Sequence, residues 1–304
     1  MNFNIIFFVM IYGFNNYLID PPFSLIVSII LLFGIANIGF FFQKFILKKI
    51  SIKNNNDILY YSPIAGSYLL ILLLYPLLIF GLLNVLLFKL ISFIILIFGI
   101  ILIIDFYIFI RKNFNHIKKY IYNNLIICLG FFALFLFSAS PITHADSLAY
   151  HASGAINILN NGSFNFDLLP FDEKLVGAGE IIIALGFVAG AEQLGGLVQF
   201  SSILAIVPLF KKIKLNHDFK YFFIYIILFT PVTIFLISSP KPQLMPAVAS
   251  LLIFAYFFKD FQRQKLNLFV IVSTIVIVLT INFLIKFSFI ISSFILWVVL
   301  VYRA

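Results

Sequence analysis

The sequence predicts an all-α fold: a polytopic transmembrane helical bundle of about ten spans, with amphipathic juxtamembrane helices in one long outer loop. Hydrophobic residues make up 63% of the 304 residues, and the mean hydropathy is +1.15. Charged residues make up 10%, whereas a soluble domain carries about 25%. Apolar runs of roughly 20 residues, the length that a helix needs to cross a bilayer, recur along the chain. The alternation typical of strands is absent, so we expect helices throughout.

Ten apolar runs define the expected spans. They cover residues 4–19, 23–43, 63–83, 90–110, 122–139, 194–210, 220–237, 243–258, 267–284 and 287–302. The first run has no basic region before it and no small-residue cleavage site after it, so we expect a retained span rather than a signal peptide. We predict a single transmembrane domain over residues 1–304.

The basic residues predict the orientation of the bundle. They gather in four clusters, at residues 44–53, 111–119, 211–220 and 259–265. With ten spans, all four clusters fall on one side, which the positive-inside rule makes cytoplasmic. The clusters also account for the net charge of +9, so we expect no nucleic-acid partner. The expected location is a bacterial inner membrane.

One long segment, residues 139–193, is left on the opposite, periplasmic side. It holds six of the eleven acidic residues of the chain, and we expect the active site there. An apolar stripe at helical spacing predicts a helix that lies in the membrane interface; its members are Leu148, Ala152, Ala155, Ile156 and Leu159. A second apolar run, residues 180–189, is too short to span and predicts a half-depth or juxtamembrane helix.

The first candidate residues lie in "THADSLAYH", residues 143–151. Thr143 and Asp146 form a T-x-x-D pattern, so helix capping alone could explain the acid. Asp146 and Tyr150 are four residues apart and share a helix face, whereas His151 is expected to point well round the helix. With His144 they form a polar cluster at the membrane surface. The histidine spacing does not match a zinc site.

Three further charged residues stand in apolar surroundings. Glu180 follows "GAG" at a helix start, where free amides would stabilise it, although its apolar flanks leave a buried functional carboxylate open. Lys241 lies between two prolines in "SSPKPQ". Lys286 lies inside an apolar run, where a charge costs about 2.5 to 3.5 kcal/mol, so it is a functional candidate unless it snorkels to the interface.

These charges suggest a substrate with a negative head and a long apolar tail. Lysines would hold a phosphate, and a carboxylate would act as general base on an incoming hydroxyl or would orient a metal ion. Lipid-linked phosphate sugars have this chemistry.

Four segments resemble one family in the expected order. "ITHADSLAYH" is similar to the D-x-L-x-Y-H segment in the first long outer loop of GT-C superfamily membrane glycosyltransferases, in their Rgt-like and dolichyl-phosphate-mannose mannosyltransferase-like branch. "GAGEIIIALG" resembles the following short helix with its acid. "PKPQLMPA" resembles the K-P-D segment at an outer helix mouth, and "LIKFSF" resembles a lysine-aromatic-Ser/Thr segment of a later helix.

The resemblance implies a polyprenyl-phosphate-linked sugar as donor, a glycan or lipid as acceptor, membrane lipids as surroundings, and inversion at the anomeric carbon. It assigns Asp146 as catalytic base or metal-orienting acid and Glu180 as a second acidic site residue. It places Lys241 and Lys286 at the donor phosphate. The pocket would be shaped by Tyr150 and His151, with His144 in the same polar cluster. A requirement for a divalent metal ion is left open.

Two features depart from the family pattern. Gln243 stands where the K-P-D segment has its acid, and the chain ends at "WVVLVYRA", directly after an apolar run. Members of that family continue with further spans, so we expect a shortened homologue or a fragment. The alternatives are a noncatalytic membrane subunit and a lipid or solute transporter. A transporter would favour charges spread through the bilayer and paired broken helices, and the sequence shows neither clearly.

Overall fold

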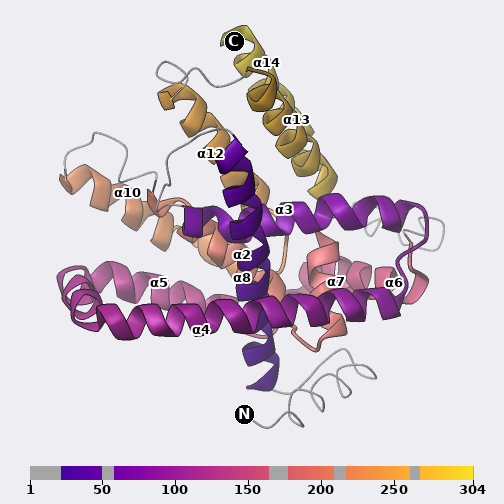
Figure 1. Ribbon diagram of the computed structural model, residues 1–304, viewed down its shortest axis with the longest axis horizontal. Coiled ribbons are helices and arrows are strands. Elements are labelled where there is room, and N and C mark those ends of the chain that lie inside the picture. The colour runs from indigo at the N-terminus through magenta and orange to yellow at the C-terminus, as the bar shows by residue number, and fades with distance from the viewer. Residues whose placement is uncertain (1–21, 50–57, 164–176, 209–216, 261–267, 304) are drawn as a thin grey trace.

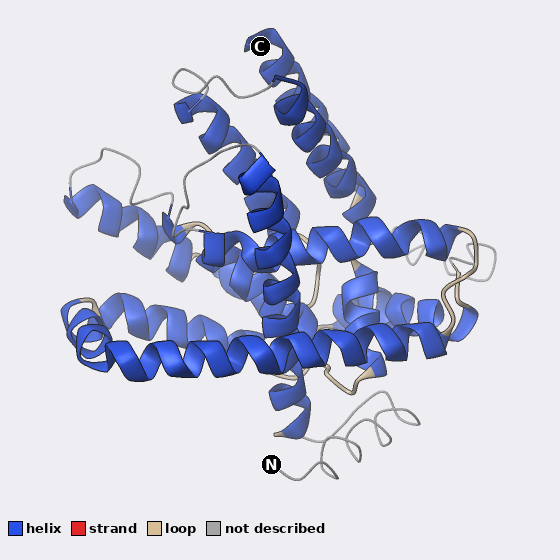
Figure 2. Ribbon diagram, in the orientation of Figure 1, coloured by secondary structure: helices blue, strands red, loops and turns tan. Residues whose placement is uncertain are grey.

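The fold is all-α in the computed structural model, which describes residues 22–49, 58–163, 177–208, 217–260 and 268–303. Within these ranges there are twelve α-helices and no strands (Figure 2). The elements are α2 (Phe23–Lys49), α3 (Ile58–Ile79), α4 (Val85–Asn123), α5 (Leu125–Ser138), the π-helix η1 (Ser147–Ala152), α6 (Ser153–Asn161), α7 (Glu180–Val188), α8 (Leu194–Leu204), α10 (His217–Phe229), α11 (Pro231–Ile237), α12 (Leu244–Asp260), α13 (Leu268–Ile285), the 3₁₀ helix η3 (Phe287–Phe289) and α14 (Ile290–Arg303).

The expected spans correspond to observed helices, except for residues 4–19, which lie outside the described residues. By length and composition α2, α3 and α4 can cross a membrane, and several shorter apolar helices accompany them. A membrane protein is therefore confirmed, while the number of crossings stays a prediction. The expected span 220–237 consists of two helices, because Thr230 is extended (φ −66°, ψ 127°) before Pro231, as the residue before a proline tends to be.

Helices α4 and α5 form an antiparallel hairpin (Figure 1). We expected a span that ends near residue 110. Helix α4 is 39 residues long and continues through the basic cluster to Asn123. It bends at Asn113 (φ −112°, ψ 18°), whose side-chain amide donates to the carbonyl of Phe109 at 2.9 Å. The basic side chains at this end are exposed, so they do not interrupt the helix.

Helix α2 runs across both α3 and α4 (Figure 1). Glycines allow these backbones to touch. A Cβ on Gly34 of α2 would lie 2.0 Å from the carbonyl oxygen of Ile95 in α4, and one on Gly66 of α3 would lie 1.9 Å from that of Ile35. Such close approach is typical of small residues at helix crossings in membranes.

Helix α7 lies in the centre of the protein, in contact with α3, α4, α6 and α8. All nine of its residues are buried. The predicted boundaries are confirmed to within one residue, and neighbouring helices enclose the helix; its position at half depth or beside the membrane stays a prediction. In the preceding stripe Ala152, Ala155 and Leu159 are buried and Leu148 is 50% exposed, and the position of that helix in the membrane interface also stays a prediction.

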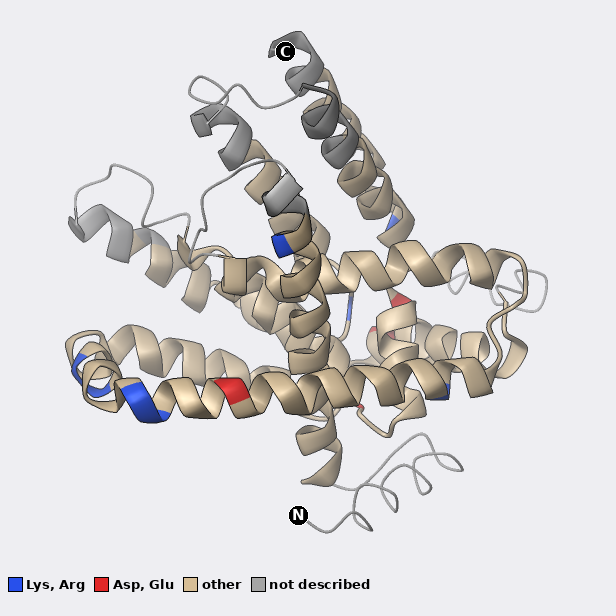
Figure 3. Ribbon diagram, viewed as in Figure 1, with Lys and Arg blue, Asp and Glu red and all other residues tan. Residues whose placement is uncertain are grey.

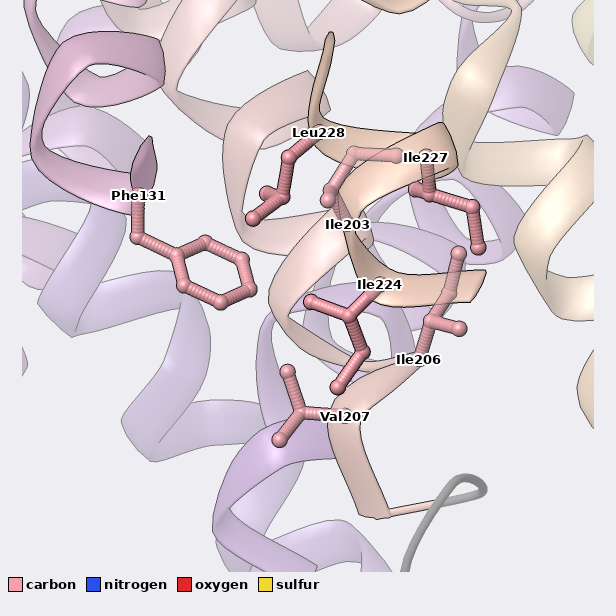
Figure 4. Close-up of a pocket in the computed structure, with 7 residues that line it drawn as sticks. All are labelled: Phe131, Ile203, Ile206, Val207, Ile224, Ile227 and Leu228. Atoms are coloured by element: carbon pink, nitrogen blue, oxygen red, sulfur yellow. The ribbon is translucent and has the colours of Figure 1, made fainter. Parts of the chain in front are cut away.

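One cavity among the described residues is purely apolar (Figure 4). It lies between α5, α8 and α10 and is lined by Phe131, Ile203, Ile206, Val207, Ile224, Ile227 and Leu228. It offers no group for acid–base chemistry, so the chemistry must be sought elsewhere.

Candidate functional site

The site is assembled where residues 177–179 pack against the end of α13. The amide of Ala178 donates to the carbonyl of Leu284 at 2.8 Å. A Cβ on Gly177 would lie 2.3 Å from the carbonyl oxygen of Ile285. Backbone cannot move aside as a flexible side chain can, so only glycine allows this approach.

The other side of the same segment faces the loop before α12. A Cβ on Gly179 would lie 2.5 Å from the ring of Pro242. The segment is therefore held between two chain regions that each carry a predicted site residue. Glu180 follows Gly179 directly, Lys241 precedes Pro242, and Lys286 follows the end of α13.

Asp146 and Lys241 form an ion pair, with 2.8 Å between Oδ2 and Nζ. The Lys241 side chain is 9% exposed and that of Asp146 is 57% exposed. The ammonium also lies 4.7 Å from the ring centre of Phe235, a cation–π contact. The hydrogen bond from Lys241 lowers the pKa of Asp146, and the charges of Lys241, His151 and His144 act in the same direction. Asp146 is therefore a carboxylate at neutral pH.

His151 and Glu180 form a second pair, with 2.5 Å between Nδ1 and Oε1, and both side chains are buried. The other carboxylate oxygen of Glu180 accepts from the amide of Gly177 at 3.0 Å. Both of the alternatives weighed for Glu180 thus apply: a backbone amide stabilises it, and it is buried. This pair joins the start of α7 to the helical segment that carries Asp146.

The start of η1 corrects one prediction about this segment. Asp146 makes no side-chain capping hydrogen bond, so capping alone does not explain the acid. We also expected His151 to point well round the helix from Asp146. The two side chains have different partners, Lys241 for Asp146 and Glu180 for His151, and Asp146 is exposed whereas His151 is buried, which agrees with that expectation.

Lys286 lies in the break between α13 and η3, with extended backbone (φ −155°, ψ 124°). It is half-buried. Burial lowers the pKa of its ammonium, the charges of Glu180 and Asp146 raise it, and Lys241 lowers it. The other three charged residues predicted from the sequence therefore all act on Lys286 electrostatically.

The remaining predicted residues differ in how they join the site. Nε2 of His144 lies 2.9 Å from the hydroxyl of Ser238, and its ring stands edge-on to Phe235 with 5.1 Å between ring centres. Tyr150 is half-buried in η1. Among the described residues no hydrogen bond joins its hydroxyl to the other predicted site residues, so its role in a pocket stays a prediction.

The sequence did not single out three residues that support the site. Phe235 and Ser238 hold Lys241 and His144. Gln199 of α8 is buried, and its carbonyl oxygen accepts from the amides of Leu244 at 2.9 Å and Met245 at 3.2 Å. It thereby caps α12 directly after the lysine loop. The available signal was an amide side chain in a mostly apolar helix.

Gln243, which stands in place of an acid, is half-buried at the start of α12. Its backbone amide donates to the carbonyl of Lys241 at 2.7 Å, which tightens the turn that presents the lysine. Its side chain adds no charge to the site, and the described carboxylate that pairs with Lys241 is Asp146.

The described residues do not form a metal site. No three His, Cys, Asp or Glu side chains among them gather closely enough to hold an ion. Three further loop acids, Asp167, Asp172 and Glu173, lie outside the described residues. The side chains present do not fit a protein-held metal, and we derive no chemistry from one.

The site lies at the opposite end of the α4–α5 hairpin from the basic cluster. Charged residues are sparse along the described ribbon (Figure 3). The cluster lies near the turn at Asn124, whereas α5 ends at Ser138 and leads toward Asp146. A helix of 14 residues is about 21 Å long, so the two charged regions are well separated. This agrees with opposite sides of the bilayer, which stays a prediction.

Residues 10–123 and 102–303 match the DUF1420 N-terminal domain family. These two segments cover nearly the whole chain, which therefore belongs to this family. No curated protein and no solved structure matches the chain. The comparisons do not assign it to the GT-C superfamily, and that resemblance stays a prediction.

Proposed function

We propose that this member of the DUF1420 N-terminal domain family transfers a sugar from a polyprenyl-phosphate donor to a glycan or lipid acceptor on the periplasmic face of the inner membrane. The observation that supports the proposal most is the Asp146–Lys241 ion pair; both of its charges, and that of Glu180, act on Lys286. Residues from four distant parts of the chain thus supply both cations and carboxylates to one place.

The two lysines suit a phosphate. Both lie in breaks between helices rather than on a solvated surface, Lys241 before α12 and Lys286 after α13. Lysine binds phosphate as a point charge, and this attraction is stronger where water is partly excluded. The Lys241 side chain is 9% exposed, so water is largely excluded around its ammonium.

The surroundings of the charges suit a lipid. Large apolar side chains flank the charged residues and are exposed: Leu148 follows Asp146 by two, Phe235 lies under Lys241, and Phe287 follows Lys286. Apolar side chains beside charged groups suit a ligand that has an apolar tail and a charged head. An isoprenoid tail and an anionic head together match this pattern.

The proposed reaction is a direct displacement. Asp146 takes the proton of the acceptor hydroxyl, and the acceptor oxygen forms a bond to the anomeric carbon. The bond between that carbon and the phosphate oxygen breaks, and its electron pair stays on the phosphate. Lys241 and Lys286 hold the resulting charge. Attack opposite to the leaving group inverts the anomeric centre, and the products are a glycoside and polyprenyl phosphate.

The test measures release of polyprenyl phosphate by the purified chain. Undecaprenyl-phosphate hexoses and pentoses are offered with a glycolipid extract as acceptor. We expect Asp146→Asn to lower the rate by about 10²- to 10⁴-fold, the usual contribution of a general base. Asp105→Asn is the matched control, because Asp105 is an exposed carboxylate of α4. Undiminished transfer by Asp146→Asn would refute the assigned role.

Two other outcomes would favour the alternatives. Donor binding without turnover, by every sugar offered, would favour a noncatalytic subunit, as the uncharged Gln243 beside Lys241 also does. Movement of labelled lipid across proteoliposomes that depends on Lys286 would favour a transporter.

A further inference from the structure

We propose that Lys241 exchanges its anionic partner during the reaction: it pairs with Asp146 in the free protein and with the donor phosphate in the loaded protein. The phosphate thereby releases the carboxylate at the moment when a base is needed. This inference rests on the proposed function and adds to it how the site is kept inactive until an anionic lipid arrives.

The pair is asymmetric, which determines which partner is replaced. Lys241 is held between Pro240 and Pro242, lies over Phe235 and is 9% exposed, whereas Asp146 is 57% exposed. An exposed carboxylate regains water when its partner leaves, at little cost, whereas a buried ammonium that is left alone is costly. The lysine therefore stays in place and requires an anion, and the aspartate is the partner that can be displaced.

A second cation favours the incoming phosphate over the aspartate. Lys286 is half-buried, and it forms no salt bridge with any of the described residues. It lies close enough to sense the charge of Lys241, which lowers the pKa of Lys286. A phosphate carries more negative charge than a carboxylate, so two neighbouring ammonium groups favour it over Asp146, which pairs with Lys241 alone.

The exchange changes the basicity of Asp146. The hydrogen bond from Lys241 is the largest cause of the low pKa of this carboxylate, and a carboxylate with a low pKa is a poor proton acceptor. When Lys241 turns to the phosphate, that hydrogen bond is lost and the pKa rises toward its ordinary value. His151 and His144 still act on the carboxylate. After transfer the exposed Asp146 gives its proton to water, and departure of the polyprenyl phosphate restores the ion pair.

The exchange also selects the substrate. A lipid with a neutral head cannot replace a carboxylate at an ammonium, so it leaves the base paired with Lys241. The geometry thus distinguishes polyprenyl phosphates from polyprenols of the same length by activation as well as by affinity.

The test is a double-mutant cycle on binding, with the full chain in detergent. The probes are farnesyl phosphate, farnesol and inorganic phosphate. The proteins are the wild type, Asp146→Asn, Lys241→Gln, the double variant and the control Asp105→Asn. Asp146 is exposed and Asn is isosteric, so Asp146→Asn is expected to fold. Lys241→Gln is checked by its thermal unfolding before its affinity is used.

We expect Asp146→Asn to bind farnesyl phosphate about two- to fivefold more tightly than the wild type, the range of a partly exposed ion pair. Lys241→Gln should bind about tenfold or more weakly, as loss of a charged hydrogen bond predicts. In the double variant the gain from Asp146→Asn should disappear, because no lysine remains to be released. Farnesol should show no such dependence, and inorganic phosphate, which lacks the apolar tail, should bind too weakly at the same concentrations to complete the cycle.

Other results separate the two proposals. If Asp146→Asn binds no better, or if its gain persists without Lys241, simple repulsion explains the effect and the exchange is refuted, while the proposed function stands. If the wild type binds farnesyl phosphate no better than farnesol, the phosphate donor itself is refuted. If inorganic phosphate alone reproduces the full cycle, the site takes a free anion and the lipid donor is refuted.

Discussion

Helices α4 and α7 are both strongly apolar, yet they occupy opposite environments. Helix α4 has 39 residues, and most of its side chains are exposed. Helix α7 has nine residues, and all of them are buried. Apolar character alone therefore does not separate a helix that faces lipid from one that is enclosed by protein. The short enclosed helix carries the site, and the long exposed one forms its support.

The two helices also differ in whether their carboxylates are exposed or buried. On α4 a carboxylate such as Asp105 is exposed, whereas at the start of α7 Glu180 is buried and both of its oxygens have partners. Removal of a paired buried group leaves its partner unsatisfied. We therefore expect the same substitution to have a large effect near α7 and almost none on α4.

The largest expected effect comes from Glu180→Ala. It leaves His151 buried without its partner and removes the acceptor for the Gly177 amide. We expect a loss of about 3 kcal/mol of unfolding free energy, in the range for breaking a buried pair. The midpoint of thermal unfolding in detergent measures it. Asp105→Ala removes the same charge from α4 and should leave the midpoint unchanged; equal effects would contradict the distinction between the two regions.

A glycine comparison tests the packing of the centre. Gly177→Ala places a methyl group against the backbone carbonyl of Ile285, and we expect a loss of about 1 to 3 kcal/mol, the usual cost of overpacking. At Gly130 of α5 a Cβ would instead meet the terminal methyl of Leu228 at 3.2 Å, which can move. Gly130→Ala should therefore cost little. The thermal midpoints of the two variants measure this difference. If Gly177→Ala leaves the midpoint unchanged, residues 177–179 are not tightly packed against the end of α13.

Much of the helical content could be predicted because runs of apolar residues set the positions of the helices. The ends of the helices and their burial were predicted less accurately. Helix α4 passes residue 110 because exposed lysines and arginines are good helix formers, although they mark the end of an apolar run. The full burial of α7 could not be predicted, since an apolar side chain is suited to lipid and to a protein core alike.

The candidate site was predicted as a set of residues but not as a set of contacts. Lys241 and Asp146 are 95 positions apart in sequence, and spacing says nothing about such a pair. The π turn was missed for a different reason. A π-helix has no signature in a helical apolar stripe of period 3.6.

A smaller effect is expected from a buried hydrogen bond between helices. The hydroxyl of Tyr68 in α3 donates to the side chain of Asn282 in α13, whose amide donates to Ser250 of α12 at 2.8 Å. Asn282 also accepts from the amide of Lys286 at 3.2 Å, so this network supports the lysine. Tyr68→Phe should cost about 1 kcal/mol in thermal unfolding.

The matched control is Tyr107→Phe on α4, where the tyrosine is 64% exposed. It removes the same hydroxyl at the surface, so we expect no change in the midpoint. A cost at Tyr107 equal to that at Tyr68 would show that α4 is packed against a partner rather than exposed.

The smallest effect on stability is expected at the residue with the largest expected effect on transfer. Asp146 is exposed, and the side-chain oxygen of an asparagine can still accept from Lys241, so Asp146→Asn should leave the thermal midpoint near that of the wild type. The direction of its pH dependence is fixed, because Lys241 lowers the pKa of Asp146 in the folded protein. The stabilisation is complete above the ordinary pKa of about 3.9 and is lost as the pH falls through the lowered value. Midpoints measured from pH 7 downward should therefore converge for the two proteins. A loss at pH 7 as large as that of Glu180→Ala would instead place Asp146 in the packed centre, and a failure of transfer could then no longer be attributed to chemistry.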